Sequence, residues 1–81
     1  MRMTAEVTLY PFNADFLPPI RGFIALLNNV EGLRVDTFPT CTVISGEDTL
    51  VYDTLRDAGR WCREQHGQIA IVTKLLPGYE A

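Results

Sequence analysis

The sequence has few of the residues from which catalytic and metal sites are built. It contains one His and two Cys among 81 residues. Cys41 and Cys62 are far apart and lack the short spacing of paired zinc ligands, so we expect free thiols rather than a disulfide. No nucleophile is paired with a base, and the lone Gly46 is not a phosphate-binding loop. We therefore expect neither an enzyme nor a metal or cofactor site.

Positive charge and long apolar runs are also scarce. The chain has seven basic and ten acidic residues, which gives a net charge of −3, and no two basic residues are adjacent in the sequence. Such a chain has no cluster of cations to neutralise nucleic-acid phosphates. No segment has the about 18 apolar residues of a membrane span, and Met1–Glu6 is too polar to open a signal peptide. We expect a cytoplasmic protein with no nucleic-acid or membrane partner.

The composition favours one packed core. The chain is 47% hydrophobic and 21% charged, which is typical of a folded domain. At this length it cannot build two separate cores, so we predict a single domain over residues 1–81. Chains of this size often gain stability by association. A homo-oligomer is therefore expected.

The first half of the chain predicts a strand and then a helix. Residues 3–10 alternate between apolar and polar, which is typical of a strand with one buried face. Pro18 and Pro19 suit the first turn of a helix, and Gly32 is a natural left-handed stop after it. The residues between them that recur at helical spacing and predict a buried stripe are Ile20, Phe23, Ile24, Leu27 and Val30.

The second half predicts a hairpin, a helix and a last strand. We expect strands over residues 33–37 and 41–45, joined by a turn at 38–40. Ser45–Asp48 is predicted to cap the following helix, which closes at His66–Gly67. The apolar stripe predicted for this helix consists of Val51, Leu55, Ala58 and Cys62. Residues 68–76 form the last predicted strand.

The predicted order is thus β-α-β-β-α-β, an α+β fold. This split pattern predicts a four-stranded antiparallel sheet in the order 4-1-3-2, with both helices on one face. Lys74 is expected to lie across from Glu6 on the other face. Since no helix covers that face, we expect it to pack against a twin or to bury an edge strand, as a homodimer or homotetramer.

The topology also predicts a binding site. We expect Tyr10–Asp15, Phe38–Cys41 and Gln65–Gly67 to meet at one end of the sheet, where loops commonly build a pocket. Trp61 is predicted to fill the edge of the core instead. The candidate ligand-binding residues are Glu6, Thr8, Tyr10, Phe38, Thr40 and Thr42. Of these, Glu6, Thr8, Tyr10 and Thr42 are expected on the open face. The alternative interpretation is that these are ordinary solvent-facing strand residues.

Several short motifs resemble a known family. Val7–Phe12, followed by Asp15–Phe16 and a helix, is similar to the opening of the YkoF-like thiamine/hydroxymethylpyrimidine-binding domains. Cys41–Glu47 resembles that family's second signature, a Thr-Val pair followed by a Gly, and Pro77–Gly78 resembles its closing Pro-Gly. Together these motifs cover nearly the whole chain, in the order and spacing of the single-domain form. The Tyr-Pro opening is the most specific of them.

The resemblance implies a ferredoxin-like fold, a homo-oligomer assembled through the sheets, and binding of thiamine or its pyrimidine precursor. An aminopyrimidine would stack on Tyr10 or Phe38, donate its amine to Glu6, and bond to the candidate threonine hydroxyls. Cys41 and Phe38–Pro39 are bulkier than the family pattern and would either narrow the pocket or change what it accepts. We therefore predict a non-catalytic small-molecule binder. The alternative is a structural or regulatory oligomerisation module without a dedicated ligand.

Overall fold

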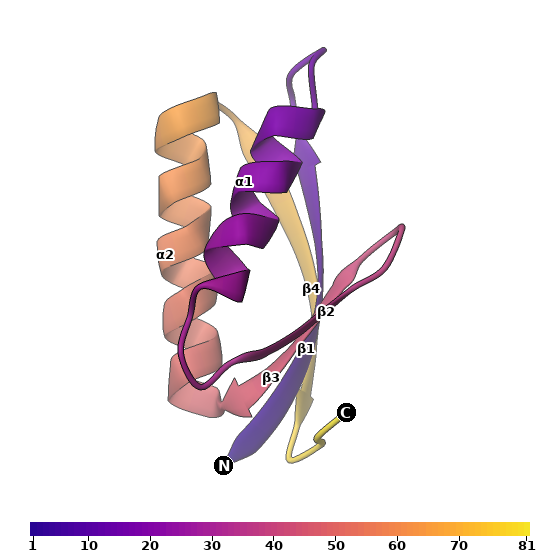
Figure 1. Cartoon of the computed structure of the whole chain (residues 1–81), viewed down its shortest axis with the longest axis vertical. Coiled ribbons are helices and arrows are strands. Elements are labelled where there is room, and N and C mark those ends of the chain that lie inside the picture. The colour runs from indigo at the N-terminus through magenta and orange to yellow at the C-terminus, as the bar shows by residue number, and fades with distance from the viewer.

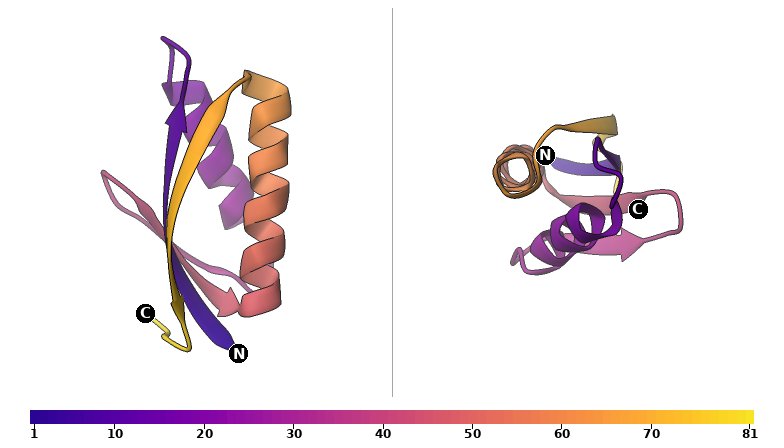
Figure 2. Two further views of the ribbon diagram at one scale, coloured as in Figure 1. Left: turned by 180° about the vertical axis from the view of Figure 1, so that it is seen from behind. Right: turned by 90° about the horizontal axis from the view of Figure 1, so that it is seen from above.

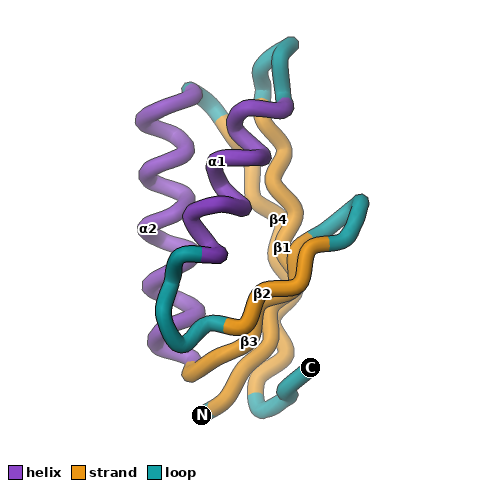
Figure 3. The backbone as a smooth tube through the Cα atoms, in the orientation of Figure 1, coloured by secondary structure: helices purple, strands orange, loops and turns teal.

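A computed structural model describes residues 1–81 and has the predicted architecture, with both helices on one face of a single sheet (Figures 1 and 2). The strands are antiparallel in the order β2-β3-β1-β4, which is the predicted 4-1-3-2 counted from the other edge. Figure 3 shows the same path by element type. In chain order the elements are β1 (Arg2–Pro11), α1 (Leu17–Asn28), β2 (Arg34–Thr37), β3 (Thr42–Glu47), α2 (Asp48–His66) and β4 (Ile69–Pro77).

Strand β1 is the centre of the sheet and supplies much of the core. It pairs with β3 on one side and β4 on the other. Because side chains alternate along a strand, its odd-numbered residues all point at the helices and its even-numbered residues point away. The buried odd-numbered residues are Met3, Ala5, Val7 and Leu9. The predicted alternation is confirmed.

The two helices pack against each other through a close contact between Gly22 and Trp61. A Cβ atom added at Gly22 would lie only 2.5 Å from the Trp61 ring, so the absence of a side chain there admits the indole. Trp61 packs on the core, as predicted. Helix α2 ends at Gly67, which has a φ of 87° and donates its N–H to the Arg63 carbonyl at 3.1 Å. Neither helix is long and apolar enough to cross a membrane.

The prediction that Ser45–Asp48 caps the second helix is wrong for its first three residues. Ser45 and Gly46 belong to β3, which continues to Glu47. Gly46 serves close packing, because a Cβ there would lie 3.3 Å from the Gly32 carbonyl oxygen. The helix begins directly at Asp48. The Glu47 side chain before it makes no capping hydrogen bond, whereas the Asp48 carboxylate accepts the Thr49 N–H at 2.9 Å. Pairing with β1 therefore determines this boundary more strongly than the turn-forming residues do.

Residues 78–81 form a short tail that folds back over the sheet face opposite the helices (Figure 1). The Thr4 hydroxyl donates to the Tyr79 carbonyl at 2.7 Å. The Arg2 guanidinium binds the Glu80 carboxylate through two hydrogen bonds of 2.9 and 3.0 Å. Thr4 thereby becomes buried on a face that no helix covers. No pattern in the sequence predicted this tail.

Candidate ligand-binding pocket

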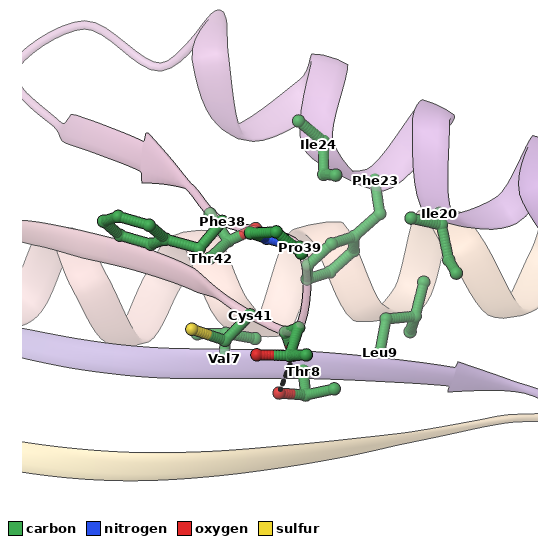
Figure 4. A pocket seen from close by; sticks show the side chains of 11 residues that line it. Val7, Thr8, Leu9, Ile20, Phe23, Ile24, Phe38, Pro39, Cys41 and Thr42 are labelled. Carbon is green, nitrogen blue, oxygen red and sulfur yellow. Dashed lines mark hydrogen bonds between the residues drawn. The ribbon is translucent and has the colours of Figure 1, made fainter.

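A pocket opens where β1 extends beyond the end of its neighbour β3. The pairing between β1 and β3 ends at Val7 and Thr42, whereas β1 continues to Pro11. Beyond Thr42 the hairpin of residues 38–41 leaves the sheet, and α1 lies above the gap. The cavity has a volume of about 160 Å³. Its walls, drawn in Figure 4, are Val7, Thr8, Leu9, Ile20, Phe23, Ile24, Phe38, Pro39, Thr40, Cys41 and Thr42.

Two hydrogen bonds hold the hairpin that forms the outer wall. The Thr8 hydroxyl donates to the Thr40 carbonyl at 3.2 Å, which is the dashed line in Figure 4. The Phe38 N–H donates to the Cys41 carbonyl at 2.8 Å and closes the turn. The exposed Phe38 ring stands at the rim. The outer wall is therefore tied to β1 although the hairpin does not continue the sheet.

The lining is mainly apolar and carries no charge. Seven of the eleven lining residues are hydrophobic, and the polar side chains are three threonines. The only ionisable side chain among them is the Cys41 thiol, which is partly buried. Such a wall suits a neutral molecule with a large apolar surface and few polar groups.

The backbone N–H and C=O of Leu9 have no strand partner on the side of β1 where the pocket lies. Even-numbered β1 residues direct their backbone groups to β4, as the bonds Phe12 N–H to Gln68 and Gly78 N–H to Arg2 show. Odd-numbered residues therefore face the β3 side. The strand partner that Leu9 would have there lies beyond the end of β3, and no backbone hydrogen bond joins Leu9 to the hairpin. Its N–H and C=O are left for another partner.

Four of the six candidate residues line this pocket: Thr8, Phe38, Thr40 and Thr42. The expected position of Thr42 on the open face is wrong. Thr42 pairs directly with the core residue Val7, so its side chain lies on the helix side and is buried. The pattern Cys41–Ser45 is rich in β-branched residues on both faces, and the pairing register decides which of them point inward.

The other two candidates, Glu6 and Tyr10, lie on the open face outside the pocket. Glu6 pairs with Lys74, as predicted, and their charged atoms are 3.9 Å apart. Tyr10 lies opposite Ala70, is exposed, and does not line the cavity. The expected carboxylate for a ligand amine is therefore absent from the pocket.

The expected meeting of three loops at one end of the sheet is only partly correct. The loop after β1 and the exit of α2 do meet, because Phe12 N–H bonds to the Gln68 carbonyl at 3.0 Å and the Asn13 amide bonds to the His66 carbonyl at 2.7 Å. The hairpin instead lies beside Thr8, part-way along β1 (Figure 3). The short β3 explains this, because the hairpin must turn where that strand ends.

Helix α1 supplies pocket walls that the sequence analysis assigned to the core alone. Ile20, Phe23 and Ile24 follow one another along the same helical face and reach down to the gap beside β1 (Figure 4). Their helical spacing correctly predicted an inward stripe. The sequence did contain one indication of a cavity beneath α1, because the predicted first strand is longer than the predicted third strand. The part of the first strand that has no partner leaves space between the sheet and the helix.

The ionisable groups with altered pKa values lie outside the pocket. Burial raises the pKa of the Cys62 thiol. The Arg56 guanidinium hydrogen-bonds the Asp57 carboxylate at 2.9 Å and lowers its pKa, and Arg56 also pairs with Asp53 on the same helix face. No group of three His, Cys, Asp or Glu side chains is placed to hold a metal ion. Both cysteines are free thiols, as predicted.

No family model and no curated protein matches the chain. Solved structures do match. A Streptococcus pneumoniae protein has a TM-score of 0.90 at 20% identity, over 98% of this chain and 89% of that one. A Thermotoga maritima protein with a suggested role in thiamine biosynthesis or salvage has a TM-score of 0.84 at 16% identity, over 93% and 82%. A Bacillus cereus domain of unknown function, DUF77, has a TM-score of 0.81 at 16% identity, over 94% and 75%. These likenesses confirm the α+β ferredoxin-like fold.

Proposed function

We propose that the protein binds a small, neutral aromatic molecule without transforming it, and that a hydroxymethylpyrimidine is the first candidate. The observation that carries this proposal is the uncharged pocket between β1, the 38–41 hairpin and α1. The YkoF-like motifs around Tyr10–Pro11 and Thr42–Val43 support the choice of ligand. The suggested thiamine-related role of the Thermotoga maritima neighbour supports it as well.

The size of the cavity favours one ring. An apolar cavity of about 150 Å³ is large enough to hold benzene. The cavity of about 160 Å³ therefore has room for one six-membered ring, but not for both rings of thiamine. If thiamine itself binds, its thiazolium ring stays outside, where no lining carboxylate attracts the positive charge. We thus expect the free pyrimidine to account for most of the binding energy.

The polar groups of the pocket match those of an aminopyrimidine. The amine of the ligand would donate to the Leu9 carbonyl, and a ring nitrogen would accept from the Leu9 N–H. The Thr42 hydroxyl is available to the hydroxymethyl group, and the Phe38 ring at the rim offers a face for stacking. In this arrangement the backbone of Leu9 takes the part that the sequence analysis assigned to Glu6.

The same lining favours binding over catalysis. Cys41 is the only lining residue with a nucleophilic atom stronger than a hydroxyl, and no lining side chain is a base that would activate it. A reaction at this pocket would have to proceed without general acid–base help from its walls. A carrier or sensor of the free ligand needs no such group.

Calorimetry with hydroxymethylpyrimidine, combined with backbone amide spectra, tests the proposal. We expect saturable binding and a shift of the Leu9 amide resonance. Phe38→Ala should weaken binding about tenfold, since an aromatic contact contributes about 1 kcal/mol beyond its area. Phe12→Ala is the matched control, because Phe12 is also an exposed loop phenylalanine but lies outside the pocket. Tyr10→Ala should leave both fold and binding unchanged.

Absence of binding heat at millimolar hydroxymethylpyrimidine, with an unmoved Leu9 amide, would contradict this function. Equal losses in Phe38→Ala and Phe12→Ala would place the ligand elsewhere. The second candidate function is an oligomerisation module without a dedicated ligand. It is favoured by one observation, the exposed apolar side chains along β4.

A further inference from the structure

The tail of residues 78–81 is held on the open face of the sheet by polar contacts. The chain leaves β4 at Gly78, whose φ of 78° is in the left-handed region, and the Tyr79 N–H then donates to the Leu76 carbonyl at 3.3 Å. No residue of the tail belongs to the hydrophobic core. Tyr79 is 56% exposed, and its bond to Thr4 is made by its carbonyl rather than by its ring. Hydrogen bonds and ion pairs therefore hold the tail, rather than burial of apolar side chains.

A single hydroxyl group, that of Thr4, binds two backbone groups of the tail. It donates to the Tyr79 carbonyl at 2.7 Å and accepts the Ala81 N–H at 3.1 Å. A hydroxyl has one proton to donate and two acceptor sites. The proton between Thr4 and Ser45, whose oxygens are 2.8 Å apart, therefore comes from Ser45. The Thr4 hydroxyl thus selects a carbonyl and an N–H that are two residues apart along a peptide.

Two arginines supply the positive charge of this site. The Nε and Nη2 atoms of Arg2 bind the two carboxylate oxygens of Glu80 at 2.9 and 3.0 Å. Such a fork fits a carboxylate in both position and orientation. The Nη1 atom of Arg34 donates to the Ala81 carbonyl at 3.0 Å. The site therefore reads one acidic side chain together with the backbone on both sides of it.

Carboxylates of the sheet itself hold both guanidinium groups in place. Asp36 accepts from the Nε atom of Arg34 at 3.1 Å, and Glu47 lies 3.9 Å from the Nη1 atom of Arg2. In each arginine, other nitrogen atoms than these contact the tail. A binding group that is already oriented loses less conformational freedom when its ligand arrives. The two arginines are therefore prepared for a ligand.

The site belongs to the sheet and not to the tail. Arg34, Ser45 and Thr4 are neighbours in one row across β2, β3 and β1. When the tail leaves, the hydroxyls of Thr4 and Ser45 still satisfy each other, and the core is unchanged. Ion pairs between exposed side chains stabilise a protein only slightly. We therefore expect the closed tail to exchange with an open form.

We propose that Arg2, Thr4 and Arg34 form a docking site for an acidic peptide segment of a partner protein, and that the tail occupies this site and competes with the partner. The tail shows what the site takes: a carbonyl, then a glutamate side chain, then a residue with a free backbone N–H. A simple anion would fill the Arg2 fork but has no N–H for Thr4, so a peptide fits better. The site shares no residue with the pocket, and the proposal does not rest on the proposed function.

The tail competes with such a peptide as an intramolecular ligand. A short flexible connection gives a tethered ligand an effective concentration in the millimolar range. A free peptide with the same groups therefore has to displace the tail of the wild-type chain. Glu80→Lys should release the tail, because the lysine ammonium would then lie against the Arg2 guanidinium. Glu80 is exposed and outside the core, so this change leaves the sheet and helices intact.

Titration of the full chain with the peptide acetyl-Gly-Tyr-Glu-Ala-amide tests the proposal. The readout is the amide resonances of Thr4 and Ser45. We expect saturable binding to Glu80→Lys in the millimolar range, at least about tenfold stronger than to the wild type. Tyr79→Ala is the matched control, because it changes an exposed tail side chain and keeps the carbonyl that Thr4 binds. It should bind the peptide as weakly as the wild type.

Changes in the peptide and in the site test which groups are recognised. With Glu80→Lys, a peptide that carries Gln in place of Glu should bind at least about tenfold more weakly, because the fork loses its charged partner. A peptide with Pro in place of Ala should lose at least about fivefold, because it has no N–H for Thr4. Adding Arg2→Gln should abolish saturable binding. Adding Lys74→Gln instead, which removes a cation of the same face outside the site, should leave the affinity within about twofold.

Three results would overturn the proposal. One is a Glu80→Lys chain that does not bind the peptide at about 10 mM, which is above the effective concentration of a short tether. Another is inorganic phosphate that binds Glu80→Lys as tightly as the peptide does, since the site would then be a general anion site. The third is a wild-type tail whose resonances change with protein concentration, since the tail of another chain would then be the occupant. Failure of hydroxymethylpyrimidine to bind at the pocket changes none of these outcomes.

Discussion

The hydroxyl oxygens of Thr4 and Ser45 lie 2.8 Å apart on the sheet face that no helix covers, and both residues are buried. They belong to neighbouring strands and lie directly opposite each other. The Thr4 hydroxyl also donates to the Tyr79 carbonyl and accepts from the Ala81 N–H at 3.1 Å. The tail of the chain therefore covers this pair in place of a third layer.

Thr4→Val should lower the free energy of unfolding by about 1–3 kcal/mol, because it leaves several buried polar groups without partners. Chemical denaturation measures the effect. Thr37→Val is the matched control, since Thr37 is an exposed strand threonine with no side-chain hydrogen bond, and it should change stability by less than about 0.5 kcal/mol. Equal losses in the two variants would show that the hydroxyl network contributes nothing.

Gly22→Ala should destabilise the protein, although alanine favours a helix. The new methyl group would lie 2.5 Å from the Trp61 ring, and we expect a net loss of about 1–3 kcal/mol with a change in indole fluorescence. Gly59→Ala on α2 is the control. Its Cβ would meet only the flexible end of Ile71 at 3.2 Å, so we expect a change within about 1 kcal/mol of zero.

The tail should loosen in acid. The Arg2 guanidinium holds the pKa of Glu80 below its ordinary value. A carboxylate with a lowered pKa in the folded state stabilises that state above its ordinary pKa of about 4, and this contribution is lost as the pH falls through the lowered value. Thr4 and Tyr79 resonances should follow this titration below about pH 4. Glu80→Gln should abolish the dependence, whereas Glu64→Gln, on exposed α2, should retain it.

The two cysteines should differ sharply toward a thiol reagent. Cys41 is half-buried in the pocket wall, whereas Cys62 is fully buried and its pKa is raised by that burial. In the native protein we expect Cys62 to react at least about 100-fold more slowly than Cys41, because it reacts only in opened molecules. Cys41→Ser should leave a chain that is inert until it unfolds. Comparable rates in the native state would contradict the packing of Cys62 against α1.

The fold could be predicted because the local patterns agree with one another. Alternation in β1 placed Ala5, Val7 and Leu9 inward, and helical spacing placed Phe23 and Leu27 inward. Each of these patterns rests on a period that only one type of element produces. The antiparallel order made β1 and β4 neighbours but did not determine their register, and the expected position of Lys74 across from Glu6 is confirmed by the pairing.

The site could be predicted only in part, because it depends on where strands end. The predicted third strand began at Cys41 with Thr42 outward, but pairing with Val7 turns Thr42 inward. Ser45 and Gly46 have turn-forming propensities that tertiary pairing overrides. The unpaired backbone of Leu9 has no side-chain signature at all, so no residue pattern could have revealed it.

Because β1 is longer than β3, the two walls of the pocket contribute differently to the stability of the fold. The inner wall, with Leu9 and Phe23, belongs to the core, so a change there costs stability. The hairpin that makes the outer wall contributes no core residue. Insertions or substitutions between Phe38 and Cys41 can therefore reshape what the cavity accepts while the scaffold stays the same. Under the proposed function, ligand preference is free to diverge through one four-residue turn.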